Sequence, residues 1–125
     1  MNVAVLGASN KPERYSFKAV RLLREKGHTV LPVHPDLPHV DGLPVWHSLK
    51  AIPDAVDTVT LYLSPRNQEP VMEELLNCSA RRVIFNPGTE NPELAERLRA
   101  QGKEVLHACT LVLLTTGQFT SAEVG

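Results

Sequence analysis

Met1-Asn-Val-Ala-Val-Leu-Gly-Ala-Ser-Asn-Lys-Pro-Glu-Arg-Tyr-Ser16 is the stretch that decides the fold of this 125-residue chain. Val3 to Leu6 is a short uninterrupted apolar run, which is typical of a strand buried on both faces of a parallel sheet. Gly7 ends the run, and a loop with two cations leads to an amphipathic stretch that begins near Ser16. Such a loop presents its amides and the positive end of a helix dipole to an anion. The stretch therefore predicts a phosphate-binding loop.

The bulk composition is that of a soluble single-domain protein. With 42% hydrophobic and 22% charged residues, the chain is large enough to bury a core of its own. A net charge of −1 argues against nucleic-acid binding through a general basic surface. Cys78 and Cys109 form neither a metal-ligand spacing nor a disulfide framework, so we expect no metal and a reducing, cytoplasmic setting. No run is long enough to span a membrane, and no basic residue precedes the first apolar run as in a signal peptide.

Strands and helices are expected to alternate along the chain. Strands are predicted at 3–6, 29–33, 43–46, 56–63, 82–85 and 104–107. Helices are predicted from an N-cap at Ser16 to Gly27, from a cap at Asn67 for about ten residues, from a cap at Asn91 to Gly102, and over 109–116, with a single turn over 48–52. This alternation indicates one α/β domain over 1–125, a Rossmann-like doubly wound parallel sheet with strand order 3-2-1-4-5-6 and helices on both faces.

The order of the strands places the ligand site. Ligands of such sheets bind beyond the carboxyl ends of the strands where the winding reverses, here between the first and fourth strands. We therefore expect the loops 7–16, 62–65 and 86–91 to surround one crevice, with the exit of the last strand at 107–109 beside them.

The first loop does not carry the nicotinamide fingerprint Gly-x-Gly-x-x-Gly. From Gly7 the chain reads Gly-Ala-Ser-Asn-Lys-Pro, so only the first glycine is present. The second strand ends in His34-Pro35, where a dinucleotide site needs an Asp or Glu for the ribose hydroxyls. A dehydrogenase would also need a substrate domain. NAD(P) binding is therefore an alternative that the pattern disfavours.

Several motifs together resemble the small stand-alone CoA-binding proteins. Gly7-Ala-Ser-x-Lys-Pro-x-Arg-Tyr-Ser16 is followed by a strand ending in Pro-Val-x-Pro35 and by Asp-Gly-Leu-Pro-Val45. Phe85-Asn-Pro-Gly-Thr-Glu-Asn-Pro92 and Ala108-Cys-Thr-Leu-Val112 resemble one branch of that family, so the likeness runs nearly end to end. The fold of these proteins is similar to the N-terminal CoA-binding domain of the succinyl-CoA synthetase α subunit. The resemblance implies coenzyme A or an acyl-CoA as the nucleotide ligand, and it implies no reaction.

The chemistry of CoA, with its pyrophosphate and 3′-phosphate, gives each candidate residue a role. Loop amides and cations would bind the phosphates, and the residues at the helix start would orient them or the ribose. By resemblance to the synthetase domain, the loop after the fourth strand would hold the adenine or pantetheine side, and the loop after the fifth would face the pantetheine arm. The candidate amides are Gly7, Ala8 and Ser9, the cations Lys11 and Arg14, the orienting residues Tyr15 and Ser16, and the remaining predicted site residues His34, Pro35, Leu63, Ser64, Pro65, Asn86, Pro87, Gly88 and Cys109.

Cys109 has two interpretations. It is expected in the first turn of the last helix, where the positive end of the dipole favours a thiolate. It would then face the pantetheine thiol, with which it could form a mixed disulfide under oxidation. The competing interpretation is packing, because cysteine is often buried and Leu111 to Leu114 make this helix apolar.

The sequence favours a binding module over an enzyme. No Ser-His-Asp or paired-carboxylate constellation is apparent, and the other domains of an acyl-CoA synthetase are not expected. The alternative is an interaction or scaffold protein whose crevice is vestigial. The apolar last helix and the Phe119 tail make a homodimer reasonable, and no nucleic-acid or membrane partner is expected.

Overall fold

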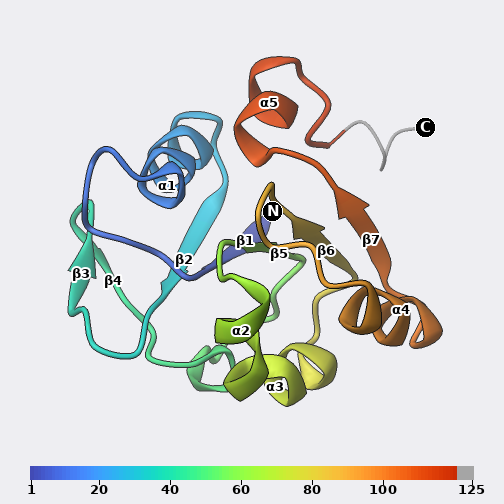
Figure 1. Cartoon of the computed structure of the whole chain (residues 1–125). Coiled ribbons are helices and arrows are strands. Elements are labelled where there is room, and N and C mark those ends of the chain that lie inside the picture. Colours follow the sequence, from blue (N-terminus) through green and yellow to red (C-terminus); the bar gives the residue numbers. More distant parts are fainter. Residues whose placement is uncertain (121–125) are drawn as a thin grey trace.

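The computed structural model of the chain describes residues 1–120, and its centre is one parallel β-sheet (Figure 1). The strands of this sheet are β1 (Asn2–Leu6), β2 (Thr29–Val33), β5 (Thr58–Leu61), β6 (Arg82–Phe85) and β7 (Glu104–His107). They lie in the order β2-β1-β5-β6-β7, and all neighbours are parallel. Val3 of β1 pairs with Val30 on one side and with Thr58 on the other. β5 begins later and ends earlier than the strand predicted over 56–63.

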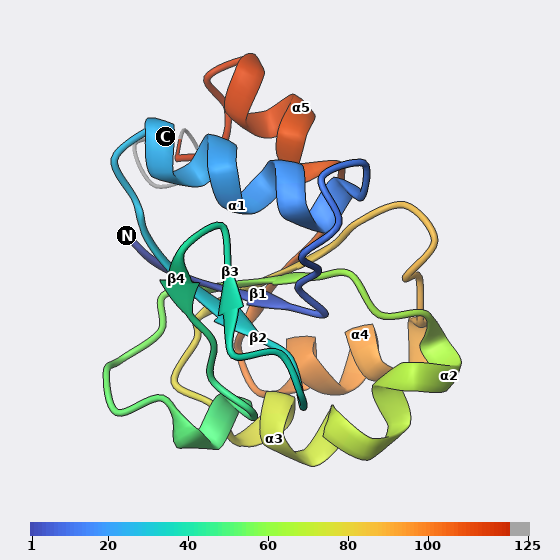
Figure 2. The ribbon, with the colours of Figure 1, turned by 90° about the vertical axis from the view of Figure 1, so that its left-hand side faces the viewer.

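Helices cover both faces of the sheet (Figures 1 and 2). They are α1 (Tyr15–Glu25), the 3-10 turn η1 (Leu49–Ala51), α2 (Pro65–Gln68), the 3-10 turn η2 (Glu69–Val71), α3 (Met72–Asn77), α4 (Pro92–Ala100) and α5 (Thr110–Thr115). Successive side chains of a strand point to opposite faces. Val3 and Val5 therefore join the core under α1 and α5, whereas Ala4 and Leu6 join the core under α3 and α4. The predicted fold class, α/β with a Rossmann-like sheet, is confirmed.

The predicted third strand, over 43–46, is wrong in its extent. A separate antiparallel hairpin forms instead from β3 (His39–Val40) and β4 (Leu43–Pro44). The φ angles at its turn, Asp41-Gly42, are 49° and 78°, and two-residue hairpin turns favour positive φ at both positions. Only Trp46 pairs with the main sheet, through an isolated parallel bridge to the last residue of β2. The order 3-2-1-4-5-6 therefore holds for five strands, and the third segment lies at the expected edge as a single bridge.

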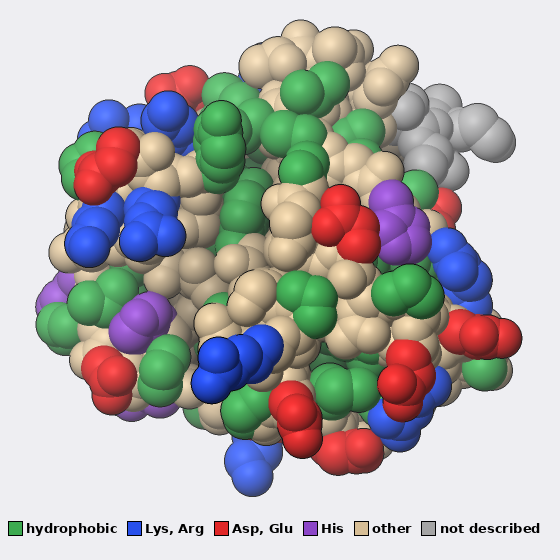
Figure 3. Space-filling model, in the orientation of Figure 1, with side chains coloured by type: hydrophobic (Ala, Val, Ile, Leu, Met, Phe, Trp, Pro, Cys, Tyr) green, Lys and Arg blue, Asp and Glu red, His purple; other side chains and the backbone are tan. Residues whose placement is uncertain are grey.

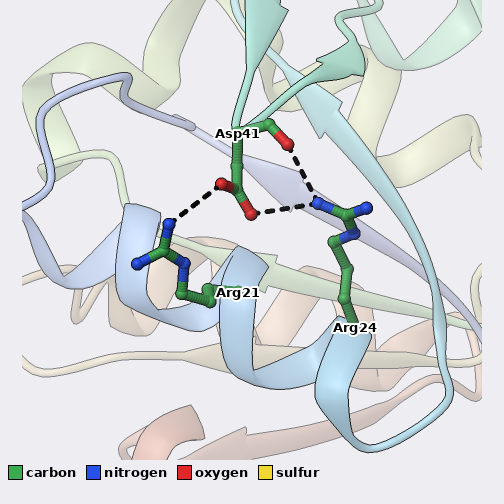
Figure 4. Close-up of polar contacts among 3 residues, drawn as sticks. All are labelled: Arg21, Arg24 and Asp41. Atoms are coloured by element: carbon green, nitrogen blue, oxygen red, sulfur yellow. Dashed lines mark hydrogen bonds and ion pairs between the residues drawn. The ribbon is translucent and has the colours of Figure 1, made fainter.

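Asp41 ties this hairpin to α1 (Figure 4). Its carboxylate accepts hydrogen bonds from Arg24 Nη1 at 3.0 Å and from Arg21 Nη2 at 3.3 Å, and its carbonyl oxygen accepts one from Arg24 Nη1 at 2.9 Å. The two arginines are three residues apart and share one helix face, so one carboxylate reaches both. Both guanidinium groups are largely exposed, so each pair contributes at most about 1 kcal/mol.

Two predicted helix starts are wrong. Ser16 is buried inside α1, and Arg14 takes the N-cap position. Asn67 lies inside α2, which begins at Pro65 because proline is favoured at the first helical position. The predicted single helix after β5 is divided into α2, η2 and α3, with Pro70 inside η2.

The other helix boundaries follow the sequence signals. Asn91 caps α4 as predicted, and its side chain accepts a hydrogen bond from the Leu94 amide at 3.2 Å. Gly102 follows the end of the same helix. Cys109, predicted in the first turn of α5, lies one position earlier, at the N-cap.

Phe119, which follows α5, is part of the core and does not form an exposed apolar surface. Phe119 is 3% exposed, and the centre of its ring lies 4.6 Å from Cζ of the buried Arg82. Arg82 also donates hydrogen bonds to the Phe119 carbonyl oxygen at 2.6 Å and to the Thr58 hydroxyl at 3.0 Å. The expectation that Phe119 would contribute to a dimer surface is therefore wrong, and the homodimer stays a prediction.

Candidate functional site

Two of the loops predicted to form the site meet at Gly7, beyond the carboxyl ends of β1 and β5. The φ angle of Gly7 is 93°. A Cβ added there would lie 3.0 Å from the Leu63 side chain and 3.1 Å from the carbonyl carbon of Tyr62. Glycine therefore lets the loop after β1 lie against the loop after β5. This is the switch point of the sheet, where ligands of such folds bind.

The first two predicted amide donors are already used. The amides of Gly7 and Ala8 both donate to the carbonyl oxygen of Val33, at 3.2 and 3.1 Å. These bonds extend the contact between β1 and β2 past the end of the strands. Neither amide is free for a phosphate in this structure, contrary to the expectation from the sequence. Ser9 is half-buried, and its hydroxyl accepts a hydrogen bond from the Lys11 amide at 3.1 Å.

The start of α1 supplies donors that the sequence reasoning did not count. The first N–H groups of a helix have no acceptor within the helix. The N-cap residue, Arg14, makes no side-chain hydrogen bond to them, and the first turn contains no acidic residue. The amides of Tyr15, Ser16 and Phe17 are thus the natural anion donors at the positive end of the helix dipole.

Cations surround this helix start. Lys11 and Arg14 are both exposed, as the prediction requires. Lys18, which the sequence analysis did not select, follows Arg14 by four residues on α1, and its Nζ lies 5.5 Å from the centre of the Tyr15 ring. The spacing of four residues could have identified Lys18 from the sequence, because residues four apart on a helix lie on the same face. Tyr15 is 68% exposed. In Figure 3, several Lys and Arg side chains lie in the region of α1, in the upper left of the view, with acidic side chains among them.

Asn86 ties three segments together beneath the crevice. Its Nδ2 donates to the Thr60 hydroxyl at 2.7 Å and to the Leu61 carbonyl oxygen at 2.9 Å, and its Oδ1 accepts from the Thr110 amide at 2.8 Å. The Thr60 and Thr110 hydroxyls are themselves 2.7 Å apart. Asn86 is 2% exposed. Its side chain is therefore a structural link between β5, β6 and α5, and the expectation that it faces a ligand does not hold.

The chain after β7 folds back over the sheet. β7 lies at the sheet edge, as predicted. The Ala108 amide then donates to the Phe85 carbonyl oxygen at 3.2 Å, and the next contact is the Thr110–Asn86 bond. The turn carries Cys109 from the edge of the sheet towards β5. This return path is what the crevice interpretation of Cys109 requires.

Tyr62 is the titratable group beside Cys109. Its hydroxyl is buried and makes no hydrogen bond of good geometry, although the Thr110 and Thr60 hydroxyls lie near it. Burial raises the pKa of Tyr62 to about 12. The two threonine hydroxyls favour the phenolate and offset part of that rise, and the Cys109 thiolate charge adds to it. Tyr62 is therefore a neutral phenol at physiological pH.

Gln68 connects two loops of the site, and the sequence reasoning missed it. Its Nε2 donates to the carbonyl oxygens of Leu63 and Thr89, both at 2.8 Å, and its Oε1 accepts from Asn91 Nδ2 at 2.9 Å. Gln68 is fully buried. The sequence did contain a pattern that could have identified it. Gln68 precedes the inward-facing Met72 by four residues, so a polar residue lies on the apolar face of the predicted helix.

The remaining predicted residues lie around the rim. His34 Nδ1 accepts hydrogen bonds from the amides of Asp36 at 3.0 Å and Leu37 at 3.1 Å. The neutral imidazole therefore carries its proton on Nε2, which is left as a donor. The Gly88 amide donates to the Glu90 carboxylate at 2.8 Å. Pro35, Ser64, Pro65, Pro87 and Gly88 are exposed, whereas Leu63 is half-buried against Gly7.

Two surface hollows lie away from this crevice. One, of about 630 Å³, is between α4 and the edge strand β7, and its lining includes Arg99 and His107. The other, of about 350 Å³, is between η1 and α3. None of the predicted site residues lines either hollow. The donors and cations, rather than the size of a cavity, locate the candidate site.

Some classes of site are not found in the described part of the chain. No helix within residues 1–120 has the length and apolar character needed to cross a membrane. Over the same residues, no three His, Cys, Asp or Glu side chains come together in a way that could hold a metal ion.

Comparison with known proteins identifies a family. A family model described as "CoA binding domain" matches residues 1–115. A crystal structure of an uncharacterised protein superposes with a TM-score of 0.89 and 41% identity, covering 94% of this chain and 97% of that one.

Two curated relatives extend the comparison. The uncharacterised protein YneT of Bacillus subtilis (strain 168) is 28% identical over 104 residues, which are 83% of this chain and 77% of YneT. The acetate–CoA ligase [ADP-forming] II subunit alpha of Pyrococcus furiosus is 30% identical over 82 residues. Those residues are 65% of this chain but only 17% of the ligase subunit, so the chain corresponds to a small part of that protein.

Proposed function

Because this chain belongs to the CoA binding domain family, we propose that it binds coenzyme A or an acyl-CoA beyond the carboxyl ends of β1, β5 and β6. The observation that carries the proposal is the start of α1. Its amides have no side-chain cap, its first turn has no acidic residue, and Lys11, Arg14 and Lys18 surround it. These are the features that a phosphate group needs, namely aligned N–H donors and mobile cations.

The proposed orientation follows from the distribution of charge. The phosphates lie at the start of α1, beside the loop between β1 and α1 that contains Ser9. The pantetheine arm extends along the rims formed by Leu63 to Pro65 and by Pro87-Gly88, which carry no cation. The thiol end then approaches Cys109 and Tyr62. This placement differs from the one expected from the sequence, because the amides of α1 replace those of Gly7 and Ala8 and the Asn86 side chain does not face the ligand.

The proposed role is binding without catalysis. One way to activate a cysteine for catalysis is an adjacent base that takes its proton. The titratable group beside Cys109 is Tyr62, and a phenol with a pKa of about 12 does not accept a thiol proton at neutral pH. The hydroxyl of Thr110, the residue after Cys109, is bonded to the hydroxyl of Thr60 at 2.7 Å.

NAD(P) is disfavoured by the end of β2. A dinucleotide site needs a carboxylate there for the ribose hydroxyls. The position holds His34, whose Nδ1 is already an acceptor for two backbone amides and whose free nitrogen is a donor.

Calorimetric titration with CoA, acetyl-CoA, NAD and NADP tests the proposal. We expect CoA or acetyl-CoA to bind more tightly than either nicotinamide cofactor, and 3′-dephospho-CoA to bind more weakly than CoA if both phosphate groups are held. Tighter binding of NAD or NADP would overturn the proposal.

A vestigial crevice on a scaffold protein is the second candidate. The internal bonds of Gly7, Ala8 and Asn86 favour it, because they remove three predicted ligand contacts. Mass spectrometry of the natively purified protein distinguishes the two. A co-purifying CoA species supports the binding module, whereas an empty protein that rejects every nucleotide in the titration supports the scaffold.

A further inference from the structure

We propose that Gln68 is a positioning residue that holds the loop after β5 and the loop after β6 as a single wall of the ligand site. The effect on ligand binding rests on the proposed function, whereas the coupling of the loops does not. Gln68 is the last residue of α2, and its side chain leaves that helix to cross into the neighbouring loop.

The hydrogen bonds of Gln68 account for nearly all of its polar capacity. A glutamine amide has two N–H donors, and both are used, on Leu63 in its own loop and on Thr89 in the other. Its oxygen accepts from Asn91, which begins α4. Within residues 1–120, the side-chain hydrogen bonds that join the 62–68 and 86–91 loops all involve Gln68, with Asn91 as its side-chain partner.

Both residues that accept hydrogen bonds from Gln68, Leu63 and Thr89, belong to loops that form the crevice. Leu63, whose carbonyl oxygen Gln68 holds, is the residue against which Gly7 packs, so the bridge extends to the loop after β1. Thr89 follows Gly88, and its amide and hydroxyl both donate to the Asn86 carbonyl oxygen. The three loops of the site are thereby fixed relative to one another through buried contacts.

Loss of the Gln68 bridge should affect the two halves of the ligand, the adenosine phosphates and the pantetheine arm, differently. In the proposed orientation, the adenosine phosphates contact the start of α1, which Gln68 does not touch. The pantetheine arm contacts the two loops that Gln68 joins. Loss of the bridge should therefore weaken binding of the whole ligand more than binding of its nucleotide half.

The test uses Gln68→Met, which keeps the length of the side chain and removes its hydrogen bonds. Its matched control is Gln101→Met, because Gln101 is an exposed glutamine at the end of α4. The first measurement is amide hydrogen exchange without ligand. We expect faster exchange over 86–96 in Gln68→Met, at least 18 residues away in sequence, and wild-type exchange in Gln101→Met. Unchanged exchange over 86–96 would overturn the coupling.

The second measurement compares affinities for CoA and for adenosine 3′,5′-bisphosphate. We expect Gln68→Met to weaken CoA binding about tenfold or more and bisphosphate binding by about twofold or less. Equal losses for both ligands would overturn the positioning role. If the wild-type protein binds no CoA, the proposed function fails, and the hydrogen-exchange result still decides the coupling.

A second variant covers the case in which Gln68→Met does not fold. Asn91→Ser keeps a side chain that caps α4 well but is too short to reach Gln68. We expect this variant to fold and to show faster exchange over 63–68, on the opposite side of the bridge. Wild-type exchange there would overturn the coupling equally well.

Discussion

Oδ1 of Asn86 accepts a 2.8 Å hydrogen bond from the backbone amide of Thr110, and this bond fixes the start of α5 over the centre of the sheet. Thr110 is separated from Asn86 by 24 residues and follows an edge strand, yet both residues are almost completely buried. The bond brings the Cys109 turn back towards β5. Whether or not Cys109 reacts, Asn86 determines where it lies.

Asn86→Ala should therefore destabilise the protein strongly. It leaves the Thr110 amide and the Leu61 carbonyl oxygen without their buried partners and opens a small cavity. We expect a loss of about 2–4 kcal/mol in the free energy of unfolding, measured by urea denaturation. The matched control is Asn67→Ala, at an exposed position, with an expected change within about 0.5 kcal/mol. Equal effects of the two substitutions would refute the structural role.

Substitution of the cations at the start of α1 should weaken CoA binding. We expect Lys11→Ala and Arg14→Ala each to cost about 1–3 kcal/mol when the phosphate contact is shielded from water, which is about 5- to 150-fold in Kd. Lys50→Ala, at an exposed lysine of η1 on the other face of the sheet, is the control and should leave Kd unchanged. Calorimetry at two salt concentrations measures both the affinity and its electrostatic part. Unchanged affinity in both variants would mean that these cations do not contact phosphate.

Tyr62 should make stability depend on pH at high pH. The folded-state pKa is about 12 and the ordinary value is 10.0, so between these two pH values the unfolded chain releases the proton while the folded chain keeps it. The contribution is fully present below pH 10 and is lost as pH rises towards 12, by about 2–3 kcal/mol in total.

Tyr62→Phe isolates that contribution. It should remove this part of the decline between about pH 10 and pH 12 in urea denaturation, and the phenolate absorbance step near pH 12. Because the Tyr62 hydroxyl lacks a good hydrogen bond, the substitution should cost little stability at neutral pH. A variant that declines with pH as steeply as the wild type would contradict the assignment.

Cys109 should react with CoA disulfide if it faces the thiol end of the ligand. Its thiolate would attack one sulfur, form the protein–CoA disulfide and release the other CoA as a thiolate. Intact mass measurement detects the adduct, and peptide mapping should place it on Cys109. The adduct should vanish in Cys109→Ser and persist in Cys78→Ser. Absence of an adduct, or an adduct on Cys78 alone, would leave Cys109 as a packing residue.

The sequence by itself determined the five strands of the main sheet, their order, and most of the helices. The apolar run Val3–Leu6, the Asn91-Pro92 helix start and the strands 82–85 and 104–107 are encoded by neighbours a few residues apart, so local patterns sufficed for them. The exposed cations Lys11 and Arg14 were also identified correctly in position, because a loop between a strand and a helix lies at the surface.

Only the tertiary structure decided how the polar groups of the site are used. The amides of Gly7 and Ala8 donate hydrogen bonds to the Val33 carbonyl oxygen, and the Asn86 side chain accepts one from the Thr110 amide. The Gln68 side chain donates one to the carbonyl oxygen of Thr89, which lies 21 residues away. A buried polar group must find a partner, but any suitable group that the fold brings near can serve. The partner is therefore set by which strands and loops become neighbours, and residue spacing along the chain does not contain that information.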